Sequence, residues 1–235
     1  MDRSRDCDRI SDPVKAAVLF LDLAGFSALT EAHGDHEAAE LAEDFAELTR
    51  AALGEGDRLV KTIGDGLMVT SPTPRSALQL VGRVAELTAR AGGYPMLRVG
   101  MNWGPVVRSS TDVYGGTVNV AARIAAIANA DEVLATGAVA SVAAGEGLAV
   151  RPMGSVTLRN IAMPVDLFSV EGLMRPLMGE WVDPVCRMRL ADSTGRPRSR
   201  AAGRDYRFCS LVCVQRFEAR PHDFLAAAAD ARIEA

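Results

Sequence analysis

Two aspartates stand where short apolar segments end, and their carboxylates suggest the first chemistry. Asp22 follows an apolar run in FLDL, and Asp65 lies in the Gly-Asp-Gly turn of KTIGDGLMV, residues 61–69. Strand ends can converge, and two close carboxylates either raise the pKa of one of them or hold a cation. Carboxylate oxygens suit Mg²⁺ or Mn²⁺, above all where substrate phosphates complete the coordination. The alternative is that each aspartate only caps an element or forms a turn.

The residues around these aspartates add two further groups. Gly25, Phe26 and Ser27 follow Asp22 at the expected start of a helix, where backbone N–H groups can bind phosphate. Lys61 stands four residues before Asp65. The local pattern is a β-hairpin with an Asp-Gly turn, and a hairpin by itself requires neither the lysine nor this acid.

Three motifs in this order, FLDLAGF, KTIGDG and DVYGGTVNVAAR, resemble the catalytic domain of the class III nucleotidyl cyclases, the adenylyl and guanylyl cyclases. The resemblance covers roughly residues 14–171 and is specific, because three separate motifs agree. It implies a ferredoxin-like α+β fold, with helices packed on a mainly antiparallel sheet. It also implies two Mg²⁺ or Mn²⁺ ions per active site, with Asp22, Leu23 and Asp65 as the metal-binding positions.

The resemblance assigns Lys61 and Asp112 to recognition of the purine base. A lysine donor and an aspartate acceptor complement N1 and the N6 amine of adenine, whereas guanine would leave the aspartate facing a carbonyl oxygen. The pair therefore favours ATP over GTP. The alternative for Asp112 is a turn residue in the segment Ser-Ser-Thr-Asp.

The same resemblance gives Asn119 the role of orienting the ribose and Arg123 that of stabilising the transition state. The two residues are four apart, on one face of an expected helix. Arg98 and Arg159 resemble arginines that contact the triphosphate, and the alternative for each is a solvated strand residue. Arg159 is the weaker match, because Asn160 stands where many members have glycine.

The reaction implied is conversion of ATP to 3′,5′-cyclic AMP and pyrophosphate. In this family one chain supplies the metal aspartates and a second chain the base-reading pair, the asparagine and the arginine. A single chain with the complete set implies a homodimer with two sites. Two alternatives are a catalytically weak nucleotide-binding regulator and a metal-sensing signalling protein in which the cyclase domain is secondary.

The elements that must position these residues follow from periodicity. Residues 14–23 are expected to form a buried strand, and apolar residues at helical spacing predict helices over 36–53, 75–91 and 117–129. Residues 97–107 are expected to form two strands around a Gly-Pro turn, and residues 132–170 to alternate short strands and turns. This order predicts helices on one face of a mostly antiparallel sheet.

The composition changes after an expected linker, residues 172–181. Residues 182–226 are rich in arginine and resemble the YHS family of small domains, which are similar to TRASH metal-binding modules. Their cysteines, Cys186, Cys209 and Cys213, suit Zn²⁺ or Cu⁺, and a unit of this size usually needs such a staple. The alternative is that the three cysteines are buried core residues.

A fourth ligand for these cysteines is not evident from the sequence. Asp183 and His222 are candidates, whereas His33 and His36 are expected to be surface residues and not ligands. The remaining cysteine, Cys7, stands alone in a polar N-terminal tail, residues 1–13.

Charge and hydropathy exclude several partners. The formal net charge of -4 gives no basic footprint for nucleic acid. No apolar run approaches the ~20 residues that span a bilayer, and the polar N-terminus does not resemble a secretory signal. The sequence therefore predicts a cytoplasmic protein that binds neither nucleic acid nor membrane, with a second short tail at 227–235.

Overall fold

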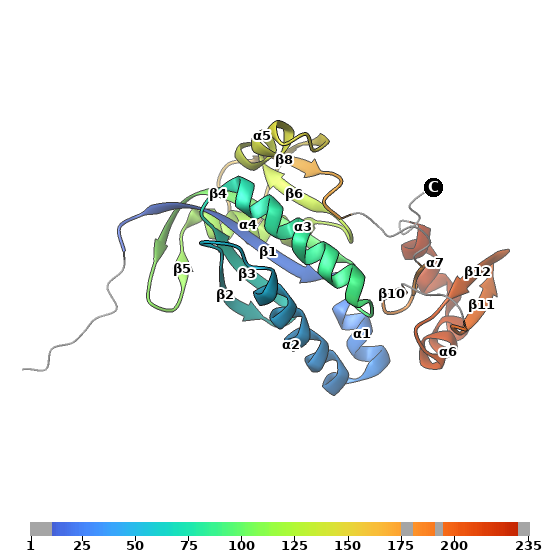
Figure 1. Ribbon diagram of the computed structural model, residues 1–235. Helices are drawn as coiled ribbons and strands as arrows, with labels where there is room; N and C mark the ends of the chain where they lie inside the picture. The colour runs from blue at the N-terminus through green and yellow to red at the C-terminus, as the bar shows by residue number, and fades with distance from the viewer. Residues whose placement is uncertain (1–10, 175–180, 191–194, 230–235) are drawn as a thin grey trace, which may run out of the picture.

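The computed structural model describes residues 11–174, 181–190 and 195–229. The chain forms a large unit around one sheet and a small C-terminal unit that packs against its side (Figure 1). Cys7, most of the expected N-terminal tail, six residues of the expected linker and the last six residues lie outside the described ranges. Among the helices of the described ranges, none combines the length and the hydropathy of a membrane span.

The central sheet has eight strands in the order β2-β3-β1-β4-β6-β8-β7, with β5 paired to β4 beside this path. Its strands are β1 (Val14–Leu23), β2 (Arg58–Ile63), β3 (Gly66–Ser71), β4 (Leu97–Arg108), β5 (Val113–Tyr114), β6 (Val133–Thr136), β7 (Val150–Val156) and β8 (Val165–Val170). Only β4 and β6 pair in parallel, and the other pairs are antiparallel. The predicted mainly antiparallel α+β fold is therefore confirmed.

Helices cover both faces of this sheet. Alternate residues of β1 point to opposite faces, and Leu19 and Leu21 belong to the core beneath α2 (Asp35–Ala52) and α3 (Pro74–Ala91). Val18 belongs to a second cluster, with Ala121 of α4 (Gly116–Ile127). The expectation that the helices lie on one face is therefore wrong, because α4 packs on the face opposite α2 and α3.

The segment 97–107 is one continuous strand, β4, and not two strands around a turn. Its glycines serve close packing: a Cβ on Gly100 would lie 2.2 Å from the backbone nitrogen of Ala125 in α4, and one on Gly104 would lie 2.7 Å from Thr117 Oγ1. The Pro105 carbonyl accepts a hydrogen bond from the Thr117 hydroxyl at 2.7 Å. This residue therefore turns its hydrogen-bonding side to α4, and pairing with β1 loses nothing through the missing N–H.

The three predicted helices, 36–53, 75–91 and 117–129, are confirmed as α2, α3 and α4, and their ends agree to within two residues. In α3, Thr73 caps the N-terminus, where its hydroxyl accepts the Ser76 N–H at 3.1 Å. The short helix α1 (Phe26–His33) precedes α2. The structure also has a helix, α5 (Gly137–Gly145), in the region expected to hold only strands and turns.

Over its described residues, 181–190 and 195–229, the C-terminal unit has two hairpins and two helices. Its elements are β9 (Trp181–Val182), β10 (Arg189–Leu190), β11 (Arg198–Ala201), β12 (Arg204–Arg207), α6 (Leu211–Ala219) and α7 (Pro221–Ala229). Its core residues Val185, Phe208 and Phe217 form one cluster with Leu29 and Ala32 of α1. The apolar side of α1 is therefore buried by the C-terminal unit.

Candidate active site and a cysteine–histidine cluster

The two predicted metal-binding aspartates lie together at the end of β1. Asp22 pairs with Arg98 across β1 and β4, and Arg98 Nε donates to its carboxylate at 2.5 Å. Asp65 occupies the tight turn between β2 and β3, where Gly64 has φ 61°. A Cβ on the next residue, Gly66, would lie 3.3 Å from Asp22 Oδ1, so the turn folds directly over Asp22.

The electrostatics of this acid pair fit a divalent cation. Burial, followed by the charge of Asp22 and a hydrogen bond to it, raises the pKa of Asp65 to about 6. A cation between the two carboxylates would remove this repulsion, and their oxygens suit Mg²⁺ or Mn²⁺. Leu23 forms a backbone hydrogen bond to Asp65, and its side chain is buried in the core. Leu23 can therefore contribute to such a site only through its backbone.

The loop after these residues leads into α1. Gly25 adopts φ 88° in the left-handed region that favours glycine, and α1 begins at Phe26. The first N–H groups of a helix have no partner within it, so the backbone of Phe26 and Ser27 presents donors at this end of the site. A Cβ on Gly25 would lie 2.6 Å from the Cγ of Arg187, so the C-terminal unit packs directly on this loop.

The predicted base-reading pair is already formed. Lys61 Nζ on β2 lies 2.6 Å from Asp112 Oδ2, at the start of β5. The hydrogen bond from Lys61 lowers the pKa of Asp112. Asp112 also belongs to a turn, because its N–H donates to Ser109 Oγ at 2.9 Å. Asp112 is therefore a turn residue and also the partner of Lys61, and the turn fixes the acid beside the lysine. Recognition of the base by this pair stays a prediction.

Asn119 and Arg123 lie one turn apart on α4, and both are exposed. Arg159 is exposed in a turn after β7, the sheet edge opposite β2, so one chain does not bring it to Asp22 or Lys61. The neighbouring Asn160 has φ 62°, a left-handed conformation that asparagine tolerates. This conformation explains how asparagine can stand where glycine was expected.

Comparison with known proteins places this geometry in a family. The protein-family model for the adenylate and guanylate cyclase catalytic domain matches residues 11–172 of this chain. The chain belongs to this family. The resemblance derived from the three motifs is therefore confirmed for the large unit, hereafter the cyclase domain.

Individual relatives agree with this assignment. The chain is 40% identical over 122 residues to an adenylate cyclase of Streptomyces coelicolor, covering 51% of this chain and 32% of that protein. An adenylate cyclase of Streptomyces griseus is 39% identical over 125 residues, covering 52% of this chain and 31% of that protein. The chain thus spans about a third of the length of these curated relatives.

A solved structure shares the fold. The adenylate/guanylate cyclase/hydrolase from Silicibacter pomeroyi superposes with a TM-score of 0.61 at 24% identity. The match covers 68% of this chain and 97% of that chain. At this identity the likeness supports the fold and not a particular substrate.

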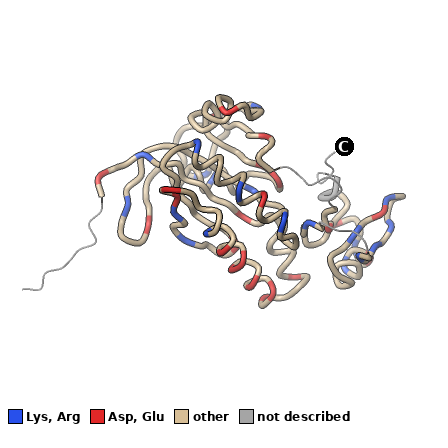
Figure 2. The backbone as a smooth tube through the Cα atoms, in the orientation of Figure 1, with Lys and Arg blue, Asp and Glu red and all other residues tan. Residues whose placement is uncertain are grey.

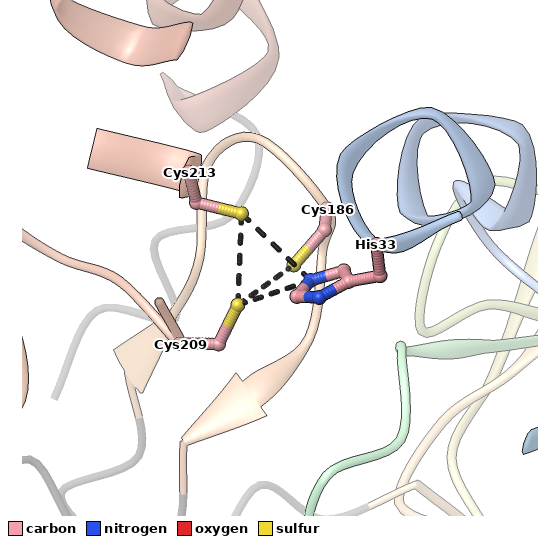
Figure 3. Close-up of side chains that lie close together, drawn as sticks. All are labelled: His33, Cys186, Cys209 and Cys213. Carbon is pink, nitrogen blue, oxygen red and sulfur yellow. Dashed lines mark hydrogen bonds between the residues drawn. The ribbon is translucent and has the colours of Figure 1, made fainter. Parts of the chain in front are cut away.

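A second group of chemical side chains lies between the cyclase domain and the C-terminal unit. Figure 3 shows the three predicted cysteines around the imidazole of His33, the last residue of α1. Cys209 Sγ lies 3.5 Å from Cys186 Sγ, 3.6 Å from Cys213 Sγ and 3.3 Å from His33 Nε2. All four potential ligand atoms lie within 4.8 Å of one another.

His33 is the functional candidate that the sequence interpretation missed. Its side chain is only 15% exposed, so the expectation of a surface residue is wrong, whereas His36 is 86% exposed as expected. His222 is exposed at the start of α7 and lies outside the cluster. Nothing in the residues around His33 signals its role, because its cysteine neighbours lie far along the chain.

Asp183, the other predicted fourth ligand, holds the cysteine loops in place instead. One carboxylate oxygen accepts the N–H groups of Val185 at 2.8 Å and Cys186 at 3.3 Å, and the other accepts the Cys209 N–H at 2.8 Å. Burial raises the pKa of Asp183 to about 6. Hydrogen bonds from Cys186 and then Cys209 lower the pKa of Cys213 to about 5, which favours its thiolate.

Proposed function

We propose that this chain is an adenylate cyclase that converts ATP to 3′,5′-cyclic AMP and pyrophosphate at sites shared by two copies. The observation that carries the proposal is the coexistence, in one cyclase domain, of the Asp22–Asp65 acid pair and the preformed Lys61–Asp112 pair. Relatives named adenylate cyclases support the same choice of reaction. The complete residue set argues against a regulator without activity.

The Lys61–Asp112 pair favours adenine. A lysine N–H can donate to adenine N1, and an aspartate can accept from the N6 amine. Guanine places a carbonyl oxygen at the second position, which leaves the aspartate facing another acceptor. Because the two side chains already lie 2.6 Å apart, the base would meet a preorganised donor and acceptor.

Asp22, Asp65 and the Leu23 backbone would hold two Mg²⁺ or Mn²⁺ ions, which when bound neutralise phosphate charge and lower the pKa of the ribose 3′ hydroxyl. The other roles fall to the chain's own residues. Backbone donors at Gly25, Phe26 and Ser27 would bind the triphosphate.

Arginines and an asparagine would complete the site. Arg98, now paired with Asp22, can exchange this partner for a phosphate once cations neutralise the acid. Asn119 would orient the ribose for in-line attack of the 3′ oxygen on the α-phosphorus. Arg123 would stabilise charge that develops on the α-phosphoryl group, a contact that strengthens in the transition state. We assign Arg159 to the triphosphate on the resemblance alone.

The arrangement of these residues supports a homodimer. Strand alternation and cross-strand register place Asp22, Arg98 and Lys61 on the sheet face that carries α4. Ile63 and Tyr114, beside the two halves of the site, are 53% and 52% exposed. A second copy packed on this face would bury these apolar side chains and could bring its exposed Arg123 to the acid pair.

For the rest of the chain we propose a YHS-like metal-binding unit over residues 182–226, joined to the cyclase domain by 172–181. In the structure, helix α7 continues to Ala229, three residues past that boundary. We also propose a cytoplasmic signalling role, in which the C-terminal unit modulates cyclic AMP synthesis and neither nucleic acid nor membrane is a partner.

Turnover of the purified full-length chain tests the proposed reaction. We expect cyclic AMP from ATP with Mn²⁺ or Mg²⁺, little cyclic GMP from GTP, and a specific activity that rises with protein concentration as dimers form. A chain that binds ATP but releases no cyclic nucleotide under any of these conditions would instead be a nucleotide-binding regulator.

Exchange of the base-reading pair should change the substrate. In the double variant Lys61→Glu, Asp112→Cys, a carboxylate acceptor faces guanine N1–H and the acceptor opposite the guanine carbonyl is removed. We expect the ratio of kcat/KM for ATP over that for GTP to fall by at least ~100-fold. Lys15→Glu, at the chain's other lysine, provides the control and should keep the ATP preference. An unchanged preference in the double variant would refute this account of base recognition.

A further inference from the structure

The four side chains at the domain boundary have the dimensions of a tetrahedral metal site. With Zn–S bonds of about 2.3 Å and a Zn–N bond of about 2.0–2.1 Å, a tetrahedral zinc ion separates its sulfur ligands by about 3.8 Å and sulfur from nitrogen by about 3.6 Å. The corresponding separations here are 3.5 and 3.6 Å between sulfurs, and 3.3 and 3.9 Å from sulfur to His33 Nε2. Such a cluster therefore needs little rearrangement to close around one ion.

We infer that His33 of the cyclase domain and the three cysteines of the C-terminal unit bind one Zn²⁺ ion, which joins the two units. Three thiolates and one imidazole form a closed ligand set, typical of a structural zinc site. The histidine distinguishes this site from one that Cu⁺ would occupy with thiolates alone. Both sides of the domain boundary are needed to complete it.

The surroundings of the ligands are organised for this role. Glu37 Oε2 lies 3.5 Å from His33 Nδ1, on the far side of the ring from the cysteines, and can fix the tautomer that leaves Nε2 free to bind. Asp183 accepts N–H groups from both cysteine loops, as described above. Outer contacts therefore orient the histidine and two of the cysteines.

The interface around the cluster joins the two units at further points. Arg189 donates to both carboxylate oxygens of Asp131 at 2.7 and 2.8 Å, and its N–H donates to the Tyr94 carbonyl at 2.9 Å. Basic residues mark much of the C-terminal unit, and acidic residues line α2, on the other side of α1 (Figure 2). Arg216 contacts Glu31 of α1. These contacts hold the cysteines against α1 and favour closure of the site.

Helix α1 connects the proposed zinc site to the candidate active site. His33 ends this eight-residue helix, and the Gly25 loop that follows Asp22 begins it. Arg187, next to Cys186, packs on Gly25. A metal bound by His33 would hold one end of α1 to the C-terminal unit, and the packing of Arg187 on Gly25 holds the other end. On the proposed adenylate cyclase function, we expect the bound metal to hold the phosphate-binding loop in place and to increase turnover.

Metal binding by the full-length chain tests the site independently of activity. We expect one Zn²⁺ per chain after metal removal and reloading, and with Co²⁺ the visible absorption of a tetrahedral thiolate site. His33→Ala should weaken Zn²⁺ binding by at least ~100-fold and change the Co²⁺ spectrum. Mutation of a residue that only hydrogen-bonds a metal ligand already lowers metal affinity by about 10–100-fold, and loss of a ligand itself should cost at least as much. His33→Cys should restore tight binding. His36→Ala, which also removes a histidine beside a glutamate four residues on, is the matched control and should bind as the wild type does.

The proposed zinc site would be wrong if His33→Ala bound Zn²⁺ as tightly as the wild type. It would also be wrong if the wild-type chain bound no Zn²⁺. Stoichiometric Cu⁺ bound by the cysteines with no effect of His33→Ala would also overturn it.

Turnover of the same samples tests the coupling to the active site. We expect Zn²⁺ removal and His33→Ala each to lower cyclic AMP formation about tenfold, with the ATP preference unchanged. Equal turnover of the loaded and metal-free forms would refute the coupling, and no turnover in any form would refute the proposed reaction while the binding data still report on the metal site. Removal of residues 176–235 is a poorer test, because it exposes Leu29 and Ala32 of α1.

Discussion

Replacement of Asp22 by alanine is expected to lower cyclic AMP formation at least ~1000-fold, about 4 kcal/mol in transition-state free energy. Asp22 contacts the other charged groups of the site: after burial, its charge is the next cause that raises the pKa of Asp65, and its carboxylate pairs with Arg98. Without it, Arg98 loses its carboxylate partner and the remaining acid cannot hold two divalent cations. Initial rates with saturating ATP and Mn²⁺ measure the loss.

Asp166→Asn is the control for this variant, because Asp166 is an exposed acid on β8, away from the acid pair. It should keep the wild-type rate. Thermal unfolding of both variants separates a loss of chemistry from a loss of folded protein. An Asp22→Ala enzyme that folds and keeps more than a tenth of the wild-type rate would contradict the assignment of metal binding to this residue.

Replacement of Arg123 by alanine should lower kcat by ~10²–10³-fold, since removal of one preorganised charge contact in the transition state costs about that much. We expect KM for ATP to change little, because the contact strengthens only as charge develops on the α-phosphoryl group. Arg123 is exposed on α4, so folding should be unaffected. Steady-state kinetics over a range of ATP concentrations separate the two parameters.

Arg90→Ala is the matched control, as Arg90 is also an exposed helical arginine, paired with Glu86 in α3. It should leave both kcat and KM unchanged. A large rise in KM with unchanged kcat for Arg123→Ala would mean that the arginine only binds substrate, and the proposed role in the transition state would be wrong.

The sequence predicts those parts of the cyclase domain that depend on local pattern. The buried strand β1 and the hairpin around Asp65 follow from a short apolar run and from turn chemistry, which are local signals. The convergence of Asp22 with Asp65 and of Lys61 with Asp112 follows from motifs that a family shares. Asp22 and the Asp65 turn lie at the ends of β1 and β3, which neighbour one another in the sheet. Lys61 lies within β2, and Asp112 precedes β5, which pairs with β4 and not with β2, so their contact is not one between neighbouring strands.

The errors arise where tertiary packing decides the outcome. Gly104 and Pro105 have the local signature of a turn, yet the glycine permits close approach of α4 and the proline sits where β1 needs no N–H. The apolar runs of β1 and β4 do not show which face each helix covers, because both faces of these strands are buried. Periodicity alone cannot distinguish one covered face from two.

His33 shows a different limit of the sequence. Its neighbours Ala32 and Gly34 indicate only the end of a helix, and its cysteine partners begin at Cys186. The contact exists because Leu29 and Ala32 pack against Val185 and Phe217, which turns the end of α1 toward the cysteines. Packing between the two units therefore creates the candidate metal site, and no spacing within one segment encodes it.

Mixing the two inactive variants tests the shared active site most directly. Full-length Asp22→Ala and Arg123→Ala chains are combined, allowed to exchange subunits, and assayed for cyclic AMP from ATP with Mn²⁺. If each site takes its acid pair from one chain and its arginine from the other, half of the dimers are mixed and each has one intact site. The account therefore predicts recovery of roughly a quarter of the wild-type rate. Mixed dimers that form, as affinity tags on the two variants would show, but stay as inactive as the separate variants would contradict it.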